Sequence, residues 1–298
     1  MEKISTNTPL VSIALCTYNG EKYLTPQLDS ILAQDYTNLE IVIVDDASTD
    51  ETFNILKAYE TKHNNIRLIK NKQNLGFNEN FKKAIDLCTG EYIAIADQDD
   101  IWLGYKISKM MRHIGNDLLL YHDSANMYDN SVSSTKSTRS FHRFVAGNCA
   151  ENLLFYNCVS GHTCLFNKAL WAQIPPFPTH FYYDWWMAYT AACLGKLNYI
   201  KDKLVNHRLH ADSSTYKDKK NPKFQRVYHL NLFLNHPLTP SKIKSLLTKL
   251  LNGYQKLEHK NFSVKLFIAL ISNAKNLFYI RKKSIISQFK FIVNESSK

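Results

Sequence analysis

The stretch "EYIAIADQDDIW", residues 91–102, is an apolar run that ends in three aspartates and a tryptophan. A continuous apolar run of this length predicts a β-strand buried on both faces, which is typical of parallel sheets. Two other stretches repeat the pattern. "LVSIALCTYN" (10–19) ends in a polar turn, and "LEIVIVDDAST" (39–49) ends in two aspartates and small polar residues. The chain therefore places polar side chains at the ends of three predicted strands.

Helices are predicted between these strands, because apolar residues recur at helical spacing or cap residues open the segment. The predicted helices are residues 23–34, 49–63 and 78–88. Alternating strands and helices predict an α/β fold with a mainly parallel sheet, in which ligands bind beyond the carboxyl ends of the strands. Neither GxGxxG nor GxxxxGK[ST] occurs, so no glycine-rich phosphate cradle is predicted.

The charge of the chain is divided unevenly along its 298 residues. Residues 1–200 hold 17 Lys/Arg and 21 Asp/Glu, whereas residues 201–298 hold 20 Lys/Arg and 5 Asp/Glu. This asymmetry suggests an anionic partner, either a membrane or a nucleic acid. The tail has the pattern of amphipathic helices with basic polar faces, at 241–260, 262–283 and 284–293.

Compartment signals are few. The six cysteines form no CxxC pair, and several stand in apolar contexts, so we expect buried, reduced thiols in a reducing compartment. The N-terminal residues lack the apolar core of a signal peptide. No run reaches the roughly 18 apolar residues of a membrane span.

The three aspartates of "DQDD" would repel one another unless a positive group lies among them. Mg²⁺ or Mn²⁺ suits such oxygen ligands and can keep positions open for phosphates. The alternative is that aspartates favour turns and helix N-caps, and Asp100 could simply cap the next helix. The acidic pair Asp45 and Asp46 on a neighbouring strand favours the cation, because two acidic strand ends facing one crevice are costly without a ligand.

These stretches, together with "NLGFNENFKKAI" (74–85), closely resemble the inverting GT-A glycosyltransferases of family 2. The form "DQDDIW" looks most like bacterial rhamnosyltransferase-type members that build surface polysaccharide. The resemblance is dense over residues 9–110, patchier to about 215 and absent from the basic tail. It implies a GT-A fold with a mixed, mainly parallel sheet flanked by helices, followed by a helical appendage.

The resemblance also implies a donor nucleotide site. The loop of Thr17, Tyr18 and Asn19 would wrap the base and ribose. Asp46, with Asp45 beside it, would hydrogen-bond the pyrimidine ring, and the turn around Asn74 and Gly76 would line the site. The nucleotide itself would be dTDP or UDP.

By the same resemblance, Asp97 and Asp99 form the DxD element of the family. Asp99 would bind the divalent metal that bridges the diphosphate, and Asp97 would lie near the ribose or sugar. In "NHRLHADSS" (206–214), Arg208 could neutralise phosphate charge. His210 could complete the metal shell or touch the diphosphate.

An inverting transferase also needs a general base for the acceptor hydroxyl. The family places an acid there, often in a pair followed by an aromatic residue. "HFYYDWWMAY" (180–189) supplies Asp184, with Tyr183 where many members carry the first acid. The alternative for Asp184 is a helix N-cap.

Acceptor contacts are predicted around this base. Trp185 and Trp186 could be a sugar-stacking platform or plain core, and we expect one of each. Gly161 would allow close backbone approach to the acceptor. His162 beside it is the remaining candidate, although an ordinary hydrogen-bonded role is the commoner one for such a histidine.

The resemblance divides the chain into a catalytic domain, residues 1–215, and a basic helical tail, residues 216–298. Within the first, residues 1–110 would bind the nucleotide and residues 111–215 the acceptor. A polysaccharide-building transferase acts on a lipid-carried acceptor, so we favour an anionic membrane over a solvated helical face for the tail. No RNP, zinc-finger or helix-turn-helix signature supports nucleic acid. The expected location is the bacterial cytoplasm, on the inner face of the plasma membrane.

Two other functions remain open at this stage. A sugar nucleotidyltransferase also uses a strand-end carboxylate pair with Mg²⁺, but it normally needs a basic glycine-rich loop that "CTYNGEKYL" (16–24) lacks. A membrane-bound scaffold with an inactive nucleotide fold is disfavoured, because both the acidic motif and the candidate base are present. The sequence leaves the donor sugar, the acceptor and the oligomeric state open.

Overall fold

The computed structural model describes residues 8–127, 142–210, 222–257 and 259–298. Packing divides them into two compact units. The first unit holds residues 8–127, 160–172 and 200–209, and the second holds the others. The polar, Ser/Thr-rich stretch 124–140, for which the sequence indicates a loop, is described only over 124–127, where it continues a strand instead. Residues 211–214 of the late motif and the start of the basic tail also lie outside the described residues.

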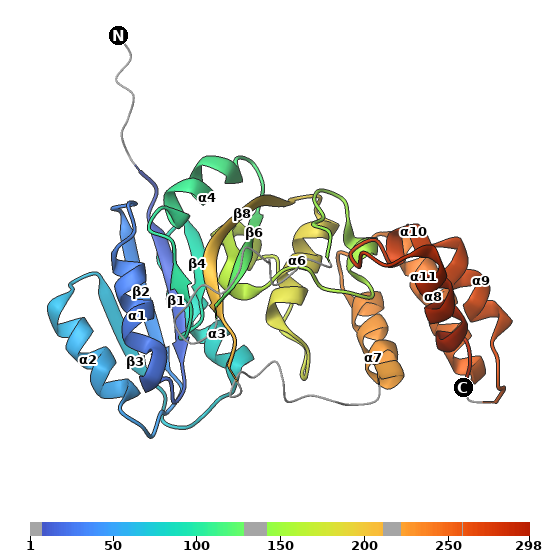
Figure 1. Ribbon diagram of the computed structural model, residues 1–298, viewed down its shortest axis with the longest axis horizontal. Coiled ribbons are helices and arrows are strands. Elements are labelled where there is room, and N and C mark those ends of the chain that lie inside the picture. Colours follow the sequence, from blue (N-terminus) through green and yellow to red (C-terminus); the bar gives the residue numbers. More distant parts are fainter. Residues whose placement is uncertain (1–7, 128–141, 211–221, 258) are drawn as a thin grey trace, which may run out of the picture. The chain divides into compact units, whose positions relative to one another are not determined.

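The first unit is built on one sheet with the strand order β3-β2-β1-β4-β7-β6-β8-β5 (Figure 1). The strands are β1 Val11–Thr17, β2 Leu39–Asp45, β3 Ile66–Lys70, β4 Tyr92–Ala96, β5 Ile101–Trp102, β6 Leu119–Met127, β7 Cys164–Asn167 and β8 Leu197–Arg208, whose first three residues belong to the second unit.

Strand direction changes across this sheet. β1 runs parallel to β2 and β4, and β2 runs parallel to β3, whereas β7 is antiparallel to β4 and β6. Thr17 is in register with Asp45, so the polar ends of β1 and β2 are neighbours. The mixed sheet confirms the predicted α/β class, and it gathers the polar strand ends at one edge as the apolar runs predicted.

The helices of the first unit are α1 Glu21–Leu32, α2 Thr52–Lys62, α3 Phe77–Leu87, α4 Lys106–Ile114 and α5 Lys168–Trp171, with a 3₁₀ turn, η2, at Gly161–Thr163. α1, α2 and α4 share one hydrophobic core with β1 and β2, to which Ile13 and Leu15 contribute. Side chains alternate along a strand, so Ala14 and Cys16 face the other side, where α3 packs. Burial on both faces explains the continuous apolar runs.

The second unit is helical in its described part. Its elements are a 3₁₀ turn, η1 Ala150–Leu153, and the helices α6 Tyr183–Cys193, α7 Pro222–Asn235, α8 Ser241–Leu257, α9 Val264–Ser272, α10 Ala274–Leu277 and α11 Ile285–Glu295. α6 is surrounded, because nine of its eleven residues are buried. The ring of Phe233 on α7 lies 4.2 Å from that of Tyr189 on α6, so helices of the basic tail pack with residues 142–159 and 173–199.

The tail differs from the sequence-based expectation in two elements, because α7 was not predicted as a helix. The predicted helix 262–283 is two helices, α9 and α10, that meet at Asn273. The Asn273 side chain donates to the Ala269 carbonyl, and a cap of this kind ends a helix. Among the described residues, no helix is both long enough and apolar enough to cross a bilayer. The domain boundary at residue 215 stays a prediction.

Candidate active site

Asp45, at the end of β2, holds the loop that follows it. Its Oδ1 accepts hydrogen bonds from Thr17 Oγ1 at 3.0 Å and Ser48 Oγ at 2.5 Å, and its Oδ2 accepts one from Ser48 N at 3.0 Å. Asn19, in a left-handed conformation with φ 46°, donates its N–H to Ser48 Oγ at 3.0 Å. The predicted base-and-ribose loop is therefore fixed to the end of the neighbouring strand.

Asp46 anchors the predicted "NLGF" turn. Its Oδ1 accepts from Asn71 Nδ2 at 2.7 Å and Leu75 N at 2.8 Å, and its Oδ2 accepts from Gly76 N at 2.9 Å. Gly76 has φ +81°, a conformation that favours glycine, and its N–H also lies 3.0 Å from Asn74 Oδ1. The conformation of the turn is therefore set by Asp46, the residue for which the resemblance implies a hydrogen bond to the pyrimidine.

The acidic pair therefore needs no cation. Asp45 and Asp46 are both buried, and each carboxylate accepts three hydrogen bonds from the protein. Several donors can stabilise a buried carboxylate. The argument that this strand end requires a ligand to offset its charge is wrong, and contact between Asp46 and the pyrimidine stays a prediction.

Replacing Asp46 by Asn is expected to lower the free energy of unfolding by about 2 kcal/mol. The amide keeps the shape of the side chain but turns an NH₂ group toward the buried donors, so at least one of them loses its hydrogen bond to residue 46. Urea denaturation would measure the loss. Asp35→Asn, at an exposed position, is the control and should change stability little. An Asp46→Asn variant as stable as the parent would contradict the anchoring role.

Gln98 was not among the predicted site residues. Its Oε1 accepts from Tyr18 N at 2.8 Å, and its Nε2 donates to Tyr18 O at 3.1 Å. Gly20 leaves room for this side chain, because a Cβ at residue 20 would come within 2.2 Å of Gln98 Oε1. Gln98, the middle residue of the DxD element, thus connects the loop of residues 97–100, which we call the aspartate loop, to the base-and-ribose loop. The sequence could not predict that Gln98 binds the backbone of Tyr18, because the two residues lie 80 positions apart.

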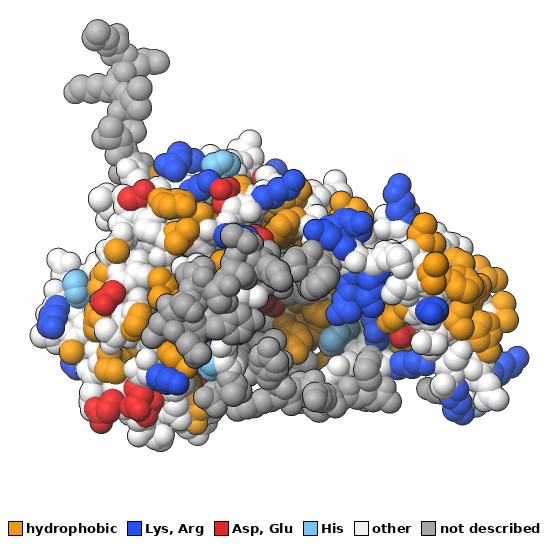
Figure 2. All heavy atoms as spheres, viewed as in Figure 1, with side chains coloured by type: hydrophobic (Ala, Val, Ile, Leu, Met, Phe, Trp, Pro, Cys, Tyr) orange, Lys and Arg blue, Asp and Glu red, His pale blue; other side chains and the backbone are white. Residues whose placement is uncertain are grey.

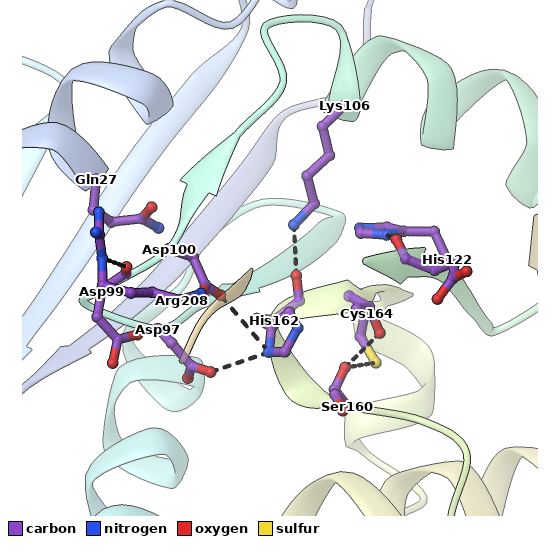
Figure 3. Close-up of polar contacts among 12 residues, drawn as sticks. Gln27, Asp97, Asp99, Asp100, Lys106, His122, Ser160, His162, Cys164 and Arg208 are labelled. Carbon is purple, nitrogen blue, oxygen red and sulfur yellow. Dashed lines mark hydrogen bonds and ion pairs between the residues drawn. The ribbon is translucent and has the colours of Figure 1, made fainter. Parts of the chain in front are cut away.

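A cluster of two carboxylates and an imidazole lies after β4 (Figure 3). His162 Nδ1 is 3.2 Å from Asp97 Oδ2 and 3.7 Å from Asp100 Oδ2. One ligand atom from each of the three residues lies within 4.8 Å of the other two. His162 was predicted near the acceptor, but η2 places its ring between the aspartates.

Asp100 is fully buried and does not cap a helix. α4 begins at Lys106, and its N-cap residue is Tyr105. Asp100 Oδ1 accepts from Arg208 N at 3.1 Å, whereas Oδ2 has no hydrogen-bond donor among the described residues. Burial, together with the nearby charges of Asp99 and Asp97, raises the pKa of Asp100 well above its usual range. The helix-cap interpretation of Asp100 is therefore wrong.

Lys106 lies next to the cluster. Its Nζ donates to the His162 carbonyl at 2.7 Å and lies 3.4 Å from the centre of the Trp102 ring (Figure 3). The side chain is fully buried, and this burial lowers the pKa of Lys106 to about 7, although Asp100 favours its charged form. The pattern of residues 103–114 predicts a helix, but it does not show that Lys106 is buried in the core.

Arg208 shapes the aspartate loop from β8. Its Nε donates to the Asp99 carbonyl at 2.8 Å, and its guanidinium lies 4.5 Å from the centre of the Tyr23 ring. The neighbouring His207 stacks on His162 with ring centres 4.7 Å apart. Both residues come from the predicted late motif, and the structure places them beside the aspartates of the first unit. Phosphate contact by Arg208 stays a prediction.

The donor set fits a divalent cation. Asp100 Oδ2 is a buried carboxylate oxygen without a hydrogen-bond donor among the described residues, and two carboxylates with one imidazole suit Mn²⁺ better than Mg²⁺, which prefers oxygen alone. Of the residues predicted for the metal, neither Asp99 nor His210 belongs to this cluster. His210 belongs to the second unit.

Asp184 lies in the first turn of α6, one residue past its start. The N-cap residue is Tyr182, so the N-cap interpretation of Asp184 does not hold. Asp184 Oδ1 accepts from Asn157 Nδ2 at 3.3 Å, and the same Nδ2 donates to Val159 O at 2.7 Å. The carboxylate is half-buried and held by an amide that is itself fixed to the backbone.

The two tryptophans after Asp184 are both buried. Trp185 Nε1 donates to Leu153 O at 2.8 Å, and Trp186 Nε1 donates to Pro175 O at 3.2 Å. Both rings pack against Phe181 and Phe233. In this structure the two indoles serve the core of the second unit, and acceptor contact by either one stays a prediction. The same holds for Gly161, which is buried in η2.

Comparison with known proteins identifies the class. Residues 12–172, more than half of the chain, match the model of glycosyl transferase family 2. The chain belongs to this family, and it is a glycosyltransferase. Of the three functions that the sequence left open, which were glycosyltransferase, sugar nucleotidyltransferase and inactive scaffold, this finding supports the first.

Two relatives illustrate the range of the match. An uncharacterized glycosyltransferase of Haemophilus influenzae is 28% identical over 241 residues, which are 76% of this chain and 74% of the relative. The putative teichuronic acid biosynthesis glycosyltransferase TuaG of Bacillus subtilis is 36% identical over 103 residues, which are 35% of this chain and 41% of the relative.

Solved structures support the fold. S. aureus TarS 1–349, in complex with UDP-GlcNAc, superposes with a TM-score of 0.65 at 19% identity, covering 90% of this chain and 81% of TarS. The mannosyltransferase PcManGT from Pyrobaculum calidifontis, in complex with GDP-Man and Mn²⁺, gives a TM-score of 0.58 at 19% identity, covering 90% of this chain and 76% of PcManGT. The predicted GT-A fold is confirmed.

Proposed function

We propose that this glycosyltransferase is metal-dependent and inverting, and that it moves a sugar from a UDP- or dTDP-linked donor to a hydroxyl of a growing bacterial surface polysaccharide. The donor site is built from the loops after β1, β2 and β4. The observation that carries the proposal is the cluster of Asp97, Asp100 and His162 beside these loops, because it fits the cation that a diphosphate donor requires. The neighbours that were solved with nucleotide-sugars favour the same donor class.

The metal site is proposed at Asp97, Asp100 and His162, with Asp99 added by the resemblance. A bound Mn²⁺ would offset the charge that develops on the departing nucleoside diphosphate. Lys106 Nζ donates to the His162 carbonyl, Arg208 Nε donates to the Asp99 carbonyl, and Arg208 N donates to Asp100 Oδ1. These hydrogen bonds keep the ligand side chains in position.

Asp184 is proposed as the general base. Its carboxylate would take the proton of the acceptor hydroxyl while that oxygen attacks the anomeric carbon of the sugar. The hydrogen bond from Asn157 positions the carboxylate through one of its oxygens. Surface polysaccharide is proposed as the product, and the similarity to TuaG supports it. A lipid-linked acceptor, and action on the inner face of the plasma membrane, are proposed with it.

The test is donor hydrolysis by the purified full chain. A thermal-shift screen of nucleotide-sugars with Mn²⁺ would first select the donor, since a ligand that binds the native state raises its stability. We expect that donor to release its nucleoside diphosphate with Mn²⁺, to stop with EDTA, and to resume when Mn²⁺ is restored. Turnover that persists in EDTA would overturn the metal requirement. Stabilisation by no nucleotide-sugar would overturn the donor assignment.

A further inference from the structure

The second unit exposes large apolar side chains on two neighbouring helices. They are Val264, Ile268 and Ile271 on α9, and Ile285, Ile286 and Phe289 on α11. Ile285 and Ile286 are 85% and 70% exposed. Soluble surfaces rarely gather this many large apolar residues in one place, and such a gathering marks an interaction surface. We call these six residues the apolar face.

Helical spacing explains how α9 contributes to the apolar face. Its three exposed residues follow one another at intervals of four and three, which places them in one stripe. The opposite side of α9 buries Leu266 and Leu270. The ring of Phe267 on α9 meets that of Phe289 on α11 edge-on, with centres 6.1 Å apart. α9 and α11 are therefore in contact beside their exposed residues.

The apolar part of α11 is held in a defined position. Ser284 caps this helix, because its Oγ accepts from Ser287 N at 3.2 Å. The two isoleucines follow directly in the first turn. Just before them, the guanidinium of Arg281 lies 4.4 Å from the centre of the Tyr156 ring, and Lys283 N donates to Arg281 O at 2.9 Å. A folded helix start thus presents two apolar side chains next to three consecutive basic residues, 281–283.

The charge around the apolar face is of one sign. Residues 259–298 contain eight Lys/Arg and one acidic residue, Glu295. All eight basic residues are exposed. Glu295 is buried and binds Arg226 Nε at 2.8 Å and Tyr254 Oη at 2.6 Å. The described surface of these residues therefore carries positive charge without an exposed carboxylate. Figure 2 shows hydrophobic side chains gathered over α9, with Lys and Arg around them.

The apolar side chains and the basic residues around them together indicate which partner covers the apolar face. A two-fold contact with a second copy would bring lysines of one copy against lysines of the other. An anionic bilayer offers both counterparts at once, because phosphates attract the basic rim and the acyl chains receive the isoleucines. We propose that the α9–α11 face is a membrane-attachment site that lies on an anionic phospholipid surface without crossing it.

Vesicle flotation of the full chain tests this proposal without any need for transferase activity. We expect the protein to float with vesicles of phosphatidylcholine mixed with phosphatidylglycerol, and to bind vesicles of phosphatidylcholine alone far less. Binding should weaken as salt is raised. The double variant Ile285→Glu/Ile286→Glu should lose more than about tenfold in partitioning, because it removes two inserted side chains and adds two repelled charges.

Matched controls separate the face from general effects of charge or polarity. Lys282→Gln/Lys283→Gln should weaken binding by roughly fivefold for each charge removed. Lys57→Gln/Lys62→Gln, on α2 of the first unit, should leave it unchanged. Phe224→Glu, at a 74% exposed position on α7, is the apolar-to-acidic control.

Three outcomes would overturn the proposal. The first is equal binding to the two kinds of vesicle, and the second is unchanged binding of the isoleucine variant. The third is a protein that floats with neither vesicle but sediments as a dimer that Ile285→Glu/Ile286→Glu dissociates, which would assign the apolar face to a second copy. Donor hydrolysis in solution, measured on the same samples, would remain as in the parent, so that failure of the attachment site and failure of the proposed function are distinguishable.

Discussion

Replacing Asp184 by Asn is expected to lower the rate of sugar transfer by about 10²–10⁴-fold, while nucleotide binding is retained. A carboxamide has nearly the shape of a carboxylate but cannot take up the acceptor proton. Its oxygen can still accept the hydrogen bond from Asn157, so the start of α6 should keep its structure. Transfer would be measured with the selected donor and a saccharide acceptor, and nucleotide binding by calorimetry.

Glu151→Gln is the matched control for this variant. Glu151 is a half-buried acid of the second unit that lies in η1. Its replacement removes one carboxylate from the same unit and should leave the rate unchanged. An Asp184→Asn enzyme that transfers sugar at the rate of the parent would rule out Asp184 as the base. Equal losses in both variants would point to a general effect of charge in this unit.

Replacing His162 by Gln is expected to weaken Mn²⁺-dependent nucleotide binding by at least about tenfold. The imidazole is the only nitrogen ligand of the proposed cluster, and it lies between the two carboxylates. Calorimetric titration of nucleoside diphosphate, with Mn²⁺ and with EDTA, would measure the loss. His207→Gln is the control, because His207 stacks on His162 but does not belong to the cluster.

The same titration separates the two assignments of the metal site. Asp99→Ala is expected to lose Mn²⁺-dependent binding as well, because the resemblance gives Asp99 the metal. Loss in Asp99→Ala with unchanged binding in His162→Gln would move the site away from the cluster. The reverse result would confine the metal to Asp97, Asp100 and His162. Unchanged affinity in both variants would exclude a metal at this strand end.

The sequence was sufficient for the fold because its strands are buried on both sides. Each of β1, β2 and β4 reads as an unbroken apolar run, and only a covered parallel strand tolerates this composition. Because these strands are parallel, the polar residues that follow them lie at the same edge of the sheet. For the same reason, the site could be located from the sequence before the roles of its side chains were known.

Pairing across long sequence distances could not be predicted. The donors that satisfy Asp46 lie 25–30 residues away, and His162 is 65 residues from Asp97. A local pattern shows a charge but not its partners, so Asp45 and Asp46 were taken for a ligand-dependent pair. Lys106 shows the same limit. Residues 103–114 have a helical pattern, but only the folded chain shows that Asp100 and the His162 carbonyl lie near Lys106.

The burial of both tryptophans could not be predicted, for a different reason. Consecutive residues on a helix point about 100° apart, so one exposed and one buried ring is the ordinary expectation. α6 departs from it because it is apolar on nearly all sides and enclosed by its neighbours. Helix enclosure depends on segments such as α7, which are distant in the sequence. Periodicity within α6 therefore could not reveal it.

The hydrogen bonds between Gln98 and Tyr18 bear on how the proposed donor would bind. Two hydrogen bonds make the loop after β1 and the loop after β4 one mechanical part, and Gly20 provides the space that this part requires. In the proposed donor site, a ligand group that shifts one loop would act on the other as well, so the two ends of a bound donor would influence each other's affinity reciprocally. A nucleoside alone, or a diphosphate alone, would therefore be a poorer mimic of the donor than the sum of its contacts suggests.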